Sequence, residues 1–123
     1  QNSQKTKVLI GDKQFELKIA NTEESRAQGL SDITRLPNNE GMLFLFDDKK
    51  ASEFWMKDTL IPLQILFIDE CTIVEMQEMP VEKDPTSPVQ TYRSSKPVDK
   101  IIELNTGAVD TEAVGTEINE LCE

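Results

Sequence analysis

The chain has 123 residues and a net charge of −10, from 13 Lys and Arg against 23 Asp and Glu. This length suits a single domain, and the negative charge argues against binding to nucleic acid or to an anionic membrane surface, because both need a positive potential. The chain contains no histidine, which excludes Ser–His and Cys–His nucleophile pairs and histidine-rich metal sites. We expect neither a bound metal nor a cofactor.

The N-terminal residues are polar and precede the first strand pattern. We expect residues 1–6 to form a flexible tail and residues 7–123 to form one β domain. The chain starts at Gln1 rather than Met. Removal of an export or lipoprotein signal, with an anchor upstream of residue 1, would explain this start, and so would trimming of a longer chain. The first alternative predicts a periplasmic or cell-surface protein. No apolar run in the sequence approaches the length of a membrane span.

Two short β-rich runs come first and are followed by the clearest helical pattern. Lys7–Gly11 and Gln14–Ala20 are expected to form strands that meet at a hairpin turn. Thr22–Gln28 is expected to form a short helix, because an N-cap candidate opens it and Gly29 can end it.

The stretch 41–69 is the richest in apolar residues and predicts three successive strands. These are Gly41–Phe46, Ser52–Thr59 and Pro62–Asp69. In the second strand, Phe54 and Met56 share one face. Trp55 shares the opposite face with Lys57. The third strand is apolar on both faces, which is typical of a central strand.

The last part of the chain alternates strands with irregular segments. Strands are expected at Thr72–Met79 and Val98–Asn105, a single turn at Asp110–Val114, and an edge strand at Thr116–Leu121. Residues 80–97 contain several prolines and are expected to form a long irregular loop. Many short strands with one small helix predict a mainly β protein, either a compact antiparallel β-sandwich or a partly closed barrel.

Five segments of the chain resemble those of a known family. They are residues 24–30 (ESRAQGL), 41–46 (GMLFLF), 54–63 (FWMKDTLIPL), 65–68 (ILFI) and 103–107 (ELNTG). Their order and spacing, over about residues 14–121, resemble the domain of unknown function 192 family of small prokaryotic proteins. The resemblance implies a compact all-β fold, often in exported or membrane-anchored proteins, and it implies no catalytic residues.

The chain departs from the pattern of that family at three positions. The family has Asn where Asp58 stands, Asp where Gln64 stands, and a Gly-containing turn where Cys71 stands. If a pocket shared by the family used the carboxylate at position 64, this chain would lack it.

Six side chains form the candidate ligand-binding site. They are Glu24, Arg26, Trp55, Lys57, Asp58 and Glu103. Because a charge that is buried without a partner is costly, these charges must either pair with one another in a network that fixes the helix to the sheet, or face a ligand. Trp55 either flanks this site or packs in the core beside Phe54.

These residues support three hypotheses about function. The first is an exported, non-enzymatic module that binds a small molecule, a glycan or a protein partner through a polar pocket near Trp55. The second is a hydrolase-like enzyme in which Asp58 and Glu103 act as a carboxylate pair. The third is a purely structural accessory domain.

Cys71 and Cys122 are the two cysteines of the chain. In an exported protein they can form one disulfide that closes a long loop. The alternative is two unrelated small apolar side chains, because sequence does not define the distance between them.

Overall fold

The computed structural model describes residues 4–123 and shows a mainly β chain with one short α-helix. Part of the expected tail, residues 1–3, lies outside the described residues, and Lys5 and Thr6 already belong to the first strand. The strands are β1 (Lys5–Ile10), β2 (Lys13–Ala20), β3 (Glu40–Lys50), β4 (Glu53–Trp55), β5 (Leu63–Asp69), β6 (Thr72–Met79), β7 (Thr91–Arg93) and β8 (Val98–Asn105). The helices are α1 (Glu23–Gln28) and two 3-10 turns, η1 (Thr111–Ala113) and η2 (Asn119–Leu121).

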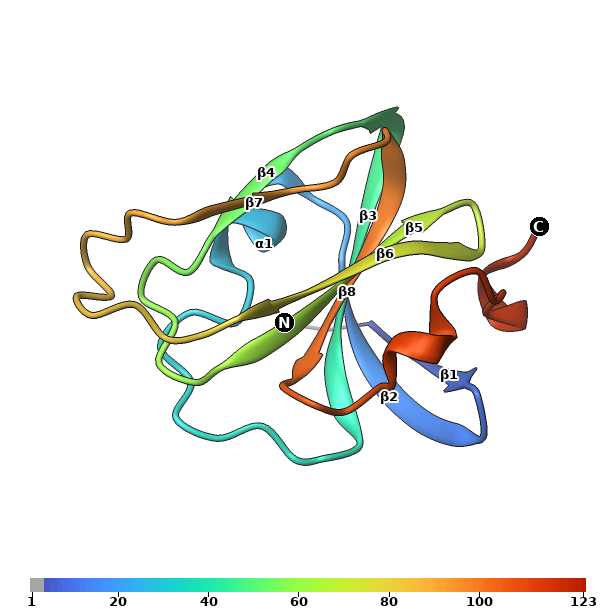
Figure 1. Ribbon diagram of the computed structural model, residues 1–123, viewed down its shortest axis with the longest axis horizontal. Coiled ribbons are helices and arrows are strands. Elements are labelled where there is room, and N and C mark those ends of the chain that lie inside the picture. The colour runs from blue at the N-terminus through green and yellow to red at the C-terminus, as the bar shows by residue number, and fades with distance from the viewer. Residues whose placement is uncertain (1–3) are drawn as a thin grey trace.

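Six strands form one twisted sheet in the order β1-β2-β3-β8-β5-β6, and β4 pairs with β7 in a separate ribbon (Figure 1). The sheet is mixed, because β2 and β3 run parallel while the other pairs are antiparallel. Parallel neighbours need a crossover connection, which α1 and the loop after it provide. The described strands form an open sheet that ends at β1 and β6, not a closed barrel. The expected mainly β class with one short helix is confirmed.

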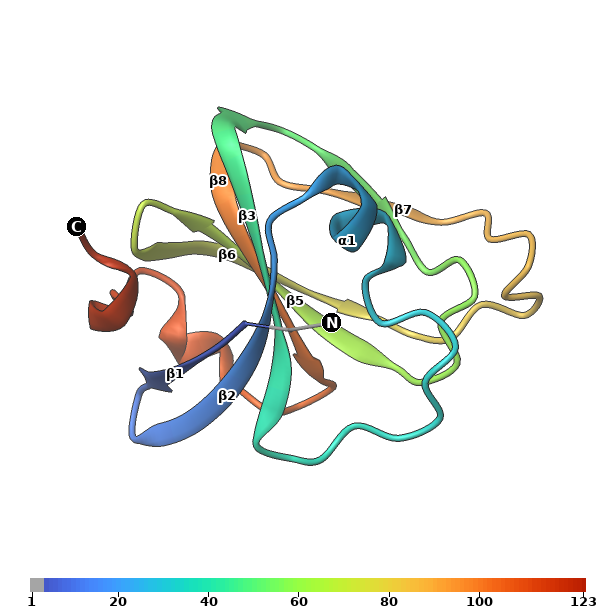
Figure 2. The same cartoon turned by 180° about the vertical axis from the view of Figure 1, so that it is seen from behind.

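The sheet is apolar on both faces, and each face has its own core. Along β5, Leu66 and Ile68 belong to one core, and Ile65 and Phe67 belong to the other. The first core lies under the C-terminal segment that contains η1 and η2. The second lies under α1 and the β4–β7 ribbon, and we call this side the helix-side face (Figure 2). Burial on both sides explains why β5 is an almost continuous apolar run.

The helix α1 ends at Gln28 as expected and begins at Glu23, one residue later than expected, with Thr22 as its N-cap. The side chain of Thr22 accepts a hydrogen bond from the backbone of Ser25, and the side chain of Ser25 accepts one from the backbone of Thr22. This reciprocal capping satisfies amides that have no partner inside the helix. Gly29 follows with φ 50°, a conformation that favours glycine and ends the helix.

The strand expected at Ser52–Thr59 is mostly wrong. Only Glu53–Trp55 is extended, and it pairs with β7 inside the segment that was expected to be irregular. The extended run ends because a turn follows it: the Thr59 amide donates to the Met56 carbonyl at 3.2 Å, and Asp58 has φ 55°. This turn directs residues 57–59 toward α1 rather than along the sheet.

The edge strand expected at Thr116–Leu121 is also wrong. This segment makes an isolated bridge between Glu117 and Thr72, and then the 3-10 turn η2. Ile118 and Leu121 are its buried residues, and a spacing of three places both on one side of a turn. In a strand the same two side chains would point to opposite faces.

Candidate functional site

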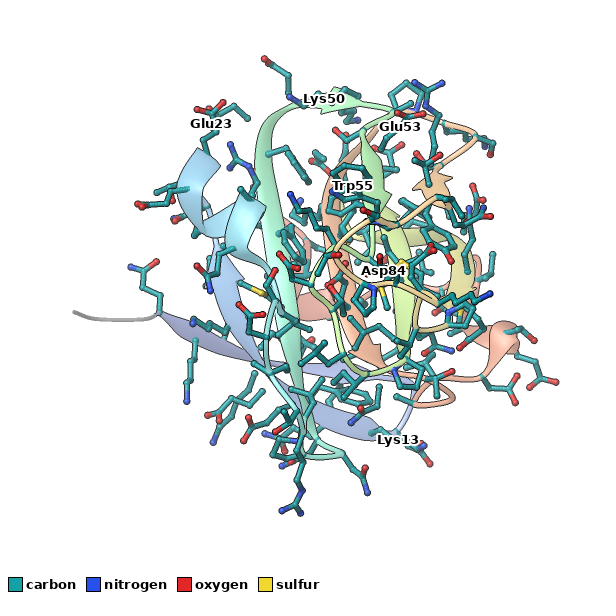
Figure 3. All side chains as sticks on the ribbon, turned by 90° about the vertical axis from the view of Figure 1, so that its left-hand side faces the viewer. Lys13, Glu23, Lys50, Glu53, Trp55 and Asp84 are labelled. Carbon is teal, nitrogen blue, oxygen red and sulfur yellow. A yellow bond between two sulfur atoms is a disulfide. The ribbon has the colours of Figure 1, made fainter. Side chains whose placement is uncertain are left out.

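A pocket of about 260 Å³ lies on the helix-side face, between α1 and the segment that follows β4. Residues 26–31 form one wall and residues 54–59 form the other, while Phe44 of β3 and Glu103 of β8 line it from the sheet. Five of the six expected ligand-binding residues line this pocket: Arg26, Trp55, Lys57, Asp58 and Glu103. Figure 3 views this side of the molecule and labels Trp55 on β4.

Glu24 is the expected site residue that the structure places elsewhere. It is exposed in the first turn of α1, where a carboxylate stabilises the positive end of the helix dipole. Arg26, two positions later in the same helix, does line the pocket. In a helix, however, residues two positions apart point in different directions.

Glu103 is a carboxylate that interrupts an apolar run, Ile101, Ile102 and Leu104, in β8. It is 7% exposed and stands on the helix-side face, because Ile101, two residues earlier on β8, packs in that core. Its neighbours across the sheet are Met42 on β3 and Ile65 on β5. No group in residues 4–123 donates a hydrogen bond to it, and burial raises the pKa of its carboxyl from 4.5 to about 7.

Trp55 lies at the mouth of the pocket and not in the core. Its side chain is 55% exposed, and the Lys57 ammonium lies 6.0 Å from its ring centroid. Lys57 has no carboxylate within ion-pair distance in the described part of the chain. The core position belongs to the neighbouring Phe54, whose ring meets that of Phe44 edge to face at 5.5 Å. The burial of Phe54 and Met56 and the exposure of Trp55 and Lys57 follow the expected pattern, although only Phe54 and Trp55 lie on a strand. The core alternative for Trp55 is wrong.

Arg26 fixes the helix to the sheet without an ion pair. Its Nη1 donates to the Leu45 carbonyl at 2.8 Å, and its guanidinium lies 5.1 Å from the centroid of the Phe46 ring. Across residues 4–123, none of the six expected site residues forms a salt bridge. The expected salt-bridge network is therefore wrong, because a backbone carbonyl and an aromatic ring take the place of a carboxylate.

Asp58 joins three segments through its backbone. Its amide donates to the Pro85 carbonyl at 2.8 Å, and its carbonyl accepts from the Asp32 amide at 2.8 Å. Its φ of 55° is one that Asp and Asn tolerate better than other side chains. The Asn that the family resemblance suggests at this position would fit the same backbone. The Asp58 side chain is half-buried and lines the pocket.

Several lining residues were not expected from the sequence. Phe44 and Met56 are buried apolar side chains whose pattern indicates only a core. Gln28 and Ser31 flank Gly29, and the helix end is the signal that could have found them, because the chain must turn there toward the sheet.

Gln64, where the family resemblance suggests Asp, lies on the other face of the sheet. Its side-chain amide donates to the Val109 carbonyl at 2.9 Å and accepts from the Val109 amide at 3.0 Å. It therefore holds the C-terminal segment against the first core. The presence of Gln rather than Asp at position 64 therefore removes no carboxylate from the pocket beside Trp55.

A larger hollow, of about 520 Å³, lies between the β1–β2 turn and the C-terminal segment. Its charged side chains are exposed acids and one lysine: Asp12, Lys13, Asp110, Glu112, Glu117 and Glu120. Exposed carboxylates are solvated and need no ligand. Because this hollow contains no buried charge within the described residues, the smaller pocket is the better candidate site.

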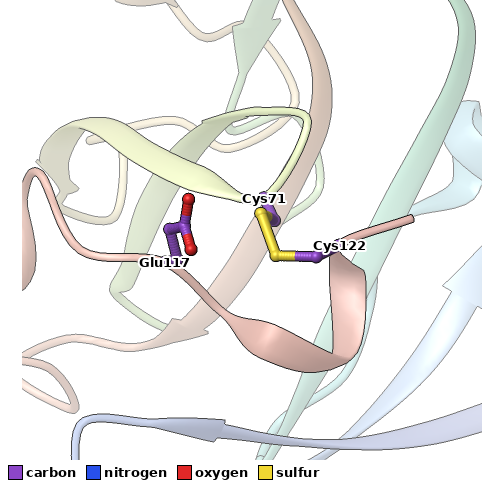
Figure 4. A group of neighbouring side chains, drawn as sticks. All are labelled: Cys71, Glu117 and Cys122. Carbon is purple, nitrogen blue, oxygen red and sulfur yellow. A yellow bond between two sulfur atoms is a disulfide. The ribbon is translucent and has the colours of Figure 1, made fainter.

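Cys71 and Cys122 form a disulfide with an S–S distance of 2.12 Å and a Cα–Cα distance of 4.9 Å. The Glu117 carboxylate lies beside it, so that three potential metal ligands come within 4.8 Å of one another (Figure 4). In the disulfide, neither sulfur is a thiolate that could bind a metal. The bridge instead ties the C-terminus to the turn between β5 and β6.

Comparison with solved structures shows the same fold in two bacterial proteins. One, from Sinorhizobium meliloti and named as a candidate transcription regulator, is 28% identical, with a TM-score of 0.77 over 95% of this chain and 91% of that one. The other, a protein of unknown function from Novosphingobium aromaticivorans, is 24% identical, with a TM-score of 0.68 over 85% of this chain and 74% of that one. No protein with curated annotation matches the chain.

No helix in residues 4–123 is long and apolar enough to span a membrane.

The family model DUF192, described as an uncharacterized ACR, matches residues 6–119. This match covers nearly the whole chain and confirms the resemblance found in the sequence. The chain belongs to the DUF192 family.

Proposed function

We propose that this chain is an exported, non-enzymatic binding module that holds a small polar ligand in the pocket beside Trp55. The observation that carries the proposal is the Glu103 carboxylate, which is buried at the pocket and receives no hydrogen bond from residues 4–123. A buried carboxylate without a partner destabilises the free protein. A ligand that donates to Glu103 would recover this free energy on binding.

The other buried polar side chains support this interpretation by contrast. Three more are buried in the described part of the chain, and each donates a hydrogen bond to a backbone carbonyl: Thr59, Gln64 and Ser94. Buried polar groups in folded proteins are nearly always satisfied in this way. Glu103 departs from that rule: it lines the same pocket as Thr59, but no hydrogen bond from residues 4–123 reaches its carboxylate.

The surroundings of Glu103 favour binding over a purely structural role. A structural network would neutralise the buried Glu103 within the protein. Within residues 4–123, Glu103 has no partner of opposite charge within ion-pair distance, and the nearby Lys57 is exposed and forms no ion pair with it. Trp55 adds a large exposed ring at the mouth of the same pocket, and aromatic rings in such positions commonly contact ligands.

The proposed export draws support from the disulfide between Cys71 and Cys122. Disulfides persist in oxidising compartments such as the periplasm and are rare in the bacterial cytosol. A ligand taken up in this pocket would therefore come from outside the cytoplasm.

A role in direct DNA binding has less support, although one similar structure is named as a candidate transcription regulator. The net charge of −10 opposes association with the phosphate backbone, which supplies most of the affinity of DNA-binding proteins.

A hydrolase-like enzyme is the second candidate, and one observation favours it. Asp58 and Glu103 line the same pocket, and with a pKa of about 7 Glu103 would be half protonated at neutral pH, as a general acid requires. Incubation with chromogenic glycosides and with peptide p-nitroanilides tests this. Turnover that Glu103→Gln abolishes would replace the binding proposal, whereas ligand binding without turnover would support it.

The binding proposal is tested by a screen of small polar molecules that records the thermal midpoint and Trp55 fluorescence together. Trp55 is the one tryptophan of the chain, so its emission reports on the mouth of the pocket directly. A ligand should raise the midpoint and change the emission, and Trp55→Ala should abolish the shift in midpoint. Val89→Ala, at another exposed apolar side chain that does not line the pocket, is the matched control. A ligand that stabilises both variants equally would place the site elsewhere.

A further inference from the structure

We propose that the ligand of this pocket is a free amino acid or a similarly small zwitterion, with its ammonium group against Glu103 and its carboxylate against Lys57. This inference rests on the binding function proposed above and adds the chemical class of the ligand. It follows from the charges, the rings and the volume of the pocket.

The chemistry of the Glu103 carboxylate determines which group of the ligand lies against it. When ionised, this carboxylate can only accept hydrogen bonds, and within residues 4–123 no cation lies within ion-pair distance of it. A neutral hydroxyl could donate one bond but would leave the buried charge uncompensated. An ammonium group supplies both the opposite charge and several donors, which makes the stronger pair.

The walls of the pocket are rich in aromatic rings. Phe44, Phe54 and Trp55 all line the pocket, and two of these rings already lie edge to face. Aromatic rings attract cations through their electron-rich faces, and rings around a carboxylate are a recurrent way to bind ammonium groups. The walls therefore suit the same group that Glu103 favours.

Besides Glu103, three charged side chains line the pocket: Arg26 on α1, and Lys57 and Asp58 after β4. Arg26 is already held by the Leu45 carbonyl and the Phe46 ring. Lys57 has no acidic partner among the described residues, so it would repel a purely cationic ligand and attract a carboxylate. A ligand that carries both charges complements Glu103 and Lys57 together.

The volume of the pocket limits the size of the ligand. The volume of about 260 Å³ is smaller than the pockets that take drug-sized ligands, which measure about 300–1,000 Å³. An oligosaccharide or a long peptide would not fit inside. A single amino acid would.

The experiment is calorimetric titration of the full chain, disulfide intact, with the standard L-amino acids and with glucose and galactose. Titrations at pH 7 in phosphate and in Tris separate the heat of binding from the heat of proton transfer. An ammonium ligand must ionise Glu103, so its binding should release about half a proton at this pH. Glu103→Gln should abolish the release and weaken binding about 10- to 100-fold, while Glu24→Gln, on the exposed turn of α1, should change neither.

Derivatives of the best amino acid test the two charges separately. Its N-acetyl form lacks the ammonium and should not bind. Its amide lacks the carboxylate and should bind about tenfold more weakly to the native protein. The tighter binding of the amino acid than of its amide should disappear in Lys57→Gln. It should persist in Lys83→Gln, because Lys83 lies on the 80–97 loop outside the pocket.

The outcomes separate the ligand class from the binding function. Sugars that change Trp55 emission without proton release, with no effect of amino acids, would overturn the zwitterion and leave the pocket as a binding site. If neither class changes Trp55 emission and the wider screen also finds no ligand, the proposed function fails with it.

Discussion

The backbone amide of Asp32 donates a hydrogen bond to the carbonyl of Asp58 at 2.8 Å, and both residues have positive φ, 67° and 55°. This bond connects the residue that follows one wall of the pocket, residues 26–31, to the turn within the other wall, residues 54–59. The width of the pocket therefore depends on two backbone conformations that most residues adopt only with strain.

Substitution of Asp58 should separate its backbone role from its side chain. Asp58→Asn should leave the free energy of unfolding within about 0.5 kcal/mol, because Asn tolerates the same φ, whereas Asp58→Ala should cost about 1 kcal/mol more. Urea unfolding measures both. Equal stability of the two variants would show that the positive φ is not retained in solution.

The stability of the protein should fall as pH rises through the range set by Glu103. Between 4.5 and about 7 the folded state holds a proton that the unfolded state has lost, so the free energy of unfolding decreases with pH across this window and levels off above it. The rise in pKa corresponds to about 3 kcal/mol at most.

Glu103→Gln should remove this component of the pH dependence and make the protein more stable than the native chain at pH 8. Glu24→Gln, on the exposed first turn of α1, is the control and should retain the native slope. Urea unfolding at several pH values is the measurement. The free energy of unfolding of the native chain could instead rise between pH 5 and 8 with the same slope as that of Glu103→Gln. This result would show that Glu103 is paired.

Two adjacent residues should respond very differently to truncation. Met56 is 1% exposed and Trp55 is 55% exposed. Met56→Ala should cost about 2–5 kcal/mol of unfolding free energy, while Trp55→Ala should cost about 1 kcal/mol or less and abolish ligand-induced stabilisation. Thermal and urea unfolding of both variants test this. A large loss of stability in Trp55→Ala would mean that this ring is needed for the fold.

Arg26→Ala should cost about 1–2 kcal/mol, less than the loss of a buried ion pair, because its partners are the Leu45 carbonyl and the Phe46 ring. The loss should be nearly independent of salt from 0.05 to 0.5 M, since no carboxylate takes part. Arg26→Lys keeps the charge and should recover only part of the stability, because one ammonium cannot reproduce the planar guanidinium. A loss of stability that disappears at high salt would indicate an ion pair instead.

Removal of the disulfide should destabilise the protein by about 4 kcal/mol in the chain-entropy description, given the separation of 51 residues between the cysteines. The double variant Cys71→Ser, Cys122→Ser, compared with the native chain in the presence and absence of dithiothreitol, measures this. Dithiothreitol should lower the midpoint of the native chain and leave the variant unchanged. A native chain that is insensitive to the reductant under unfolding conditions would show that the bridge is not formed in solution.

The local features of this fold are those that neighbouring residues determine. The alternation of Phe54 and Trp55 predicted which of these side chains faces inward, because successive strand residues point to opposite faces. The short helix and its stop at Gly29 were predicted, because caps satisfy backbone groups within the same few residues, although the helix begins one residue later than expected. The family could also be recognised from the sequence alone, since its segments are specific and span most of the chain.

The tertiary structure decided which segments meet. Alternation defines the face of a strand but not its partner, so neither the parallel pairing of β2 with β3 nor the pairing of β4 with β7 was predicted. The same limit applies to the site. The six candidate residues were selected for their chemistry, but only the packing of α1 and residues 54–59 over the sheet places Arg26, Lys57 and Asp58 around one pocket with Glu103. Whether a buried charge is paired depends on residues distant in the chain. For this reason the sequence suggested an ion-pair network, whereas the structure shows a pocket lined by the unpaired carboxylate of Glu103.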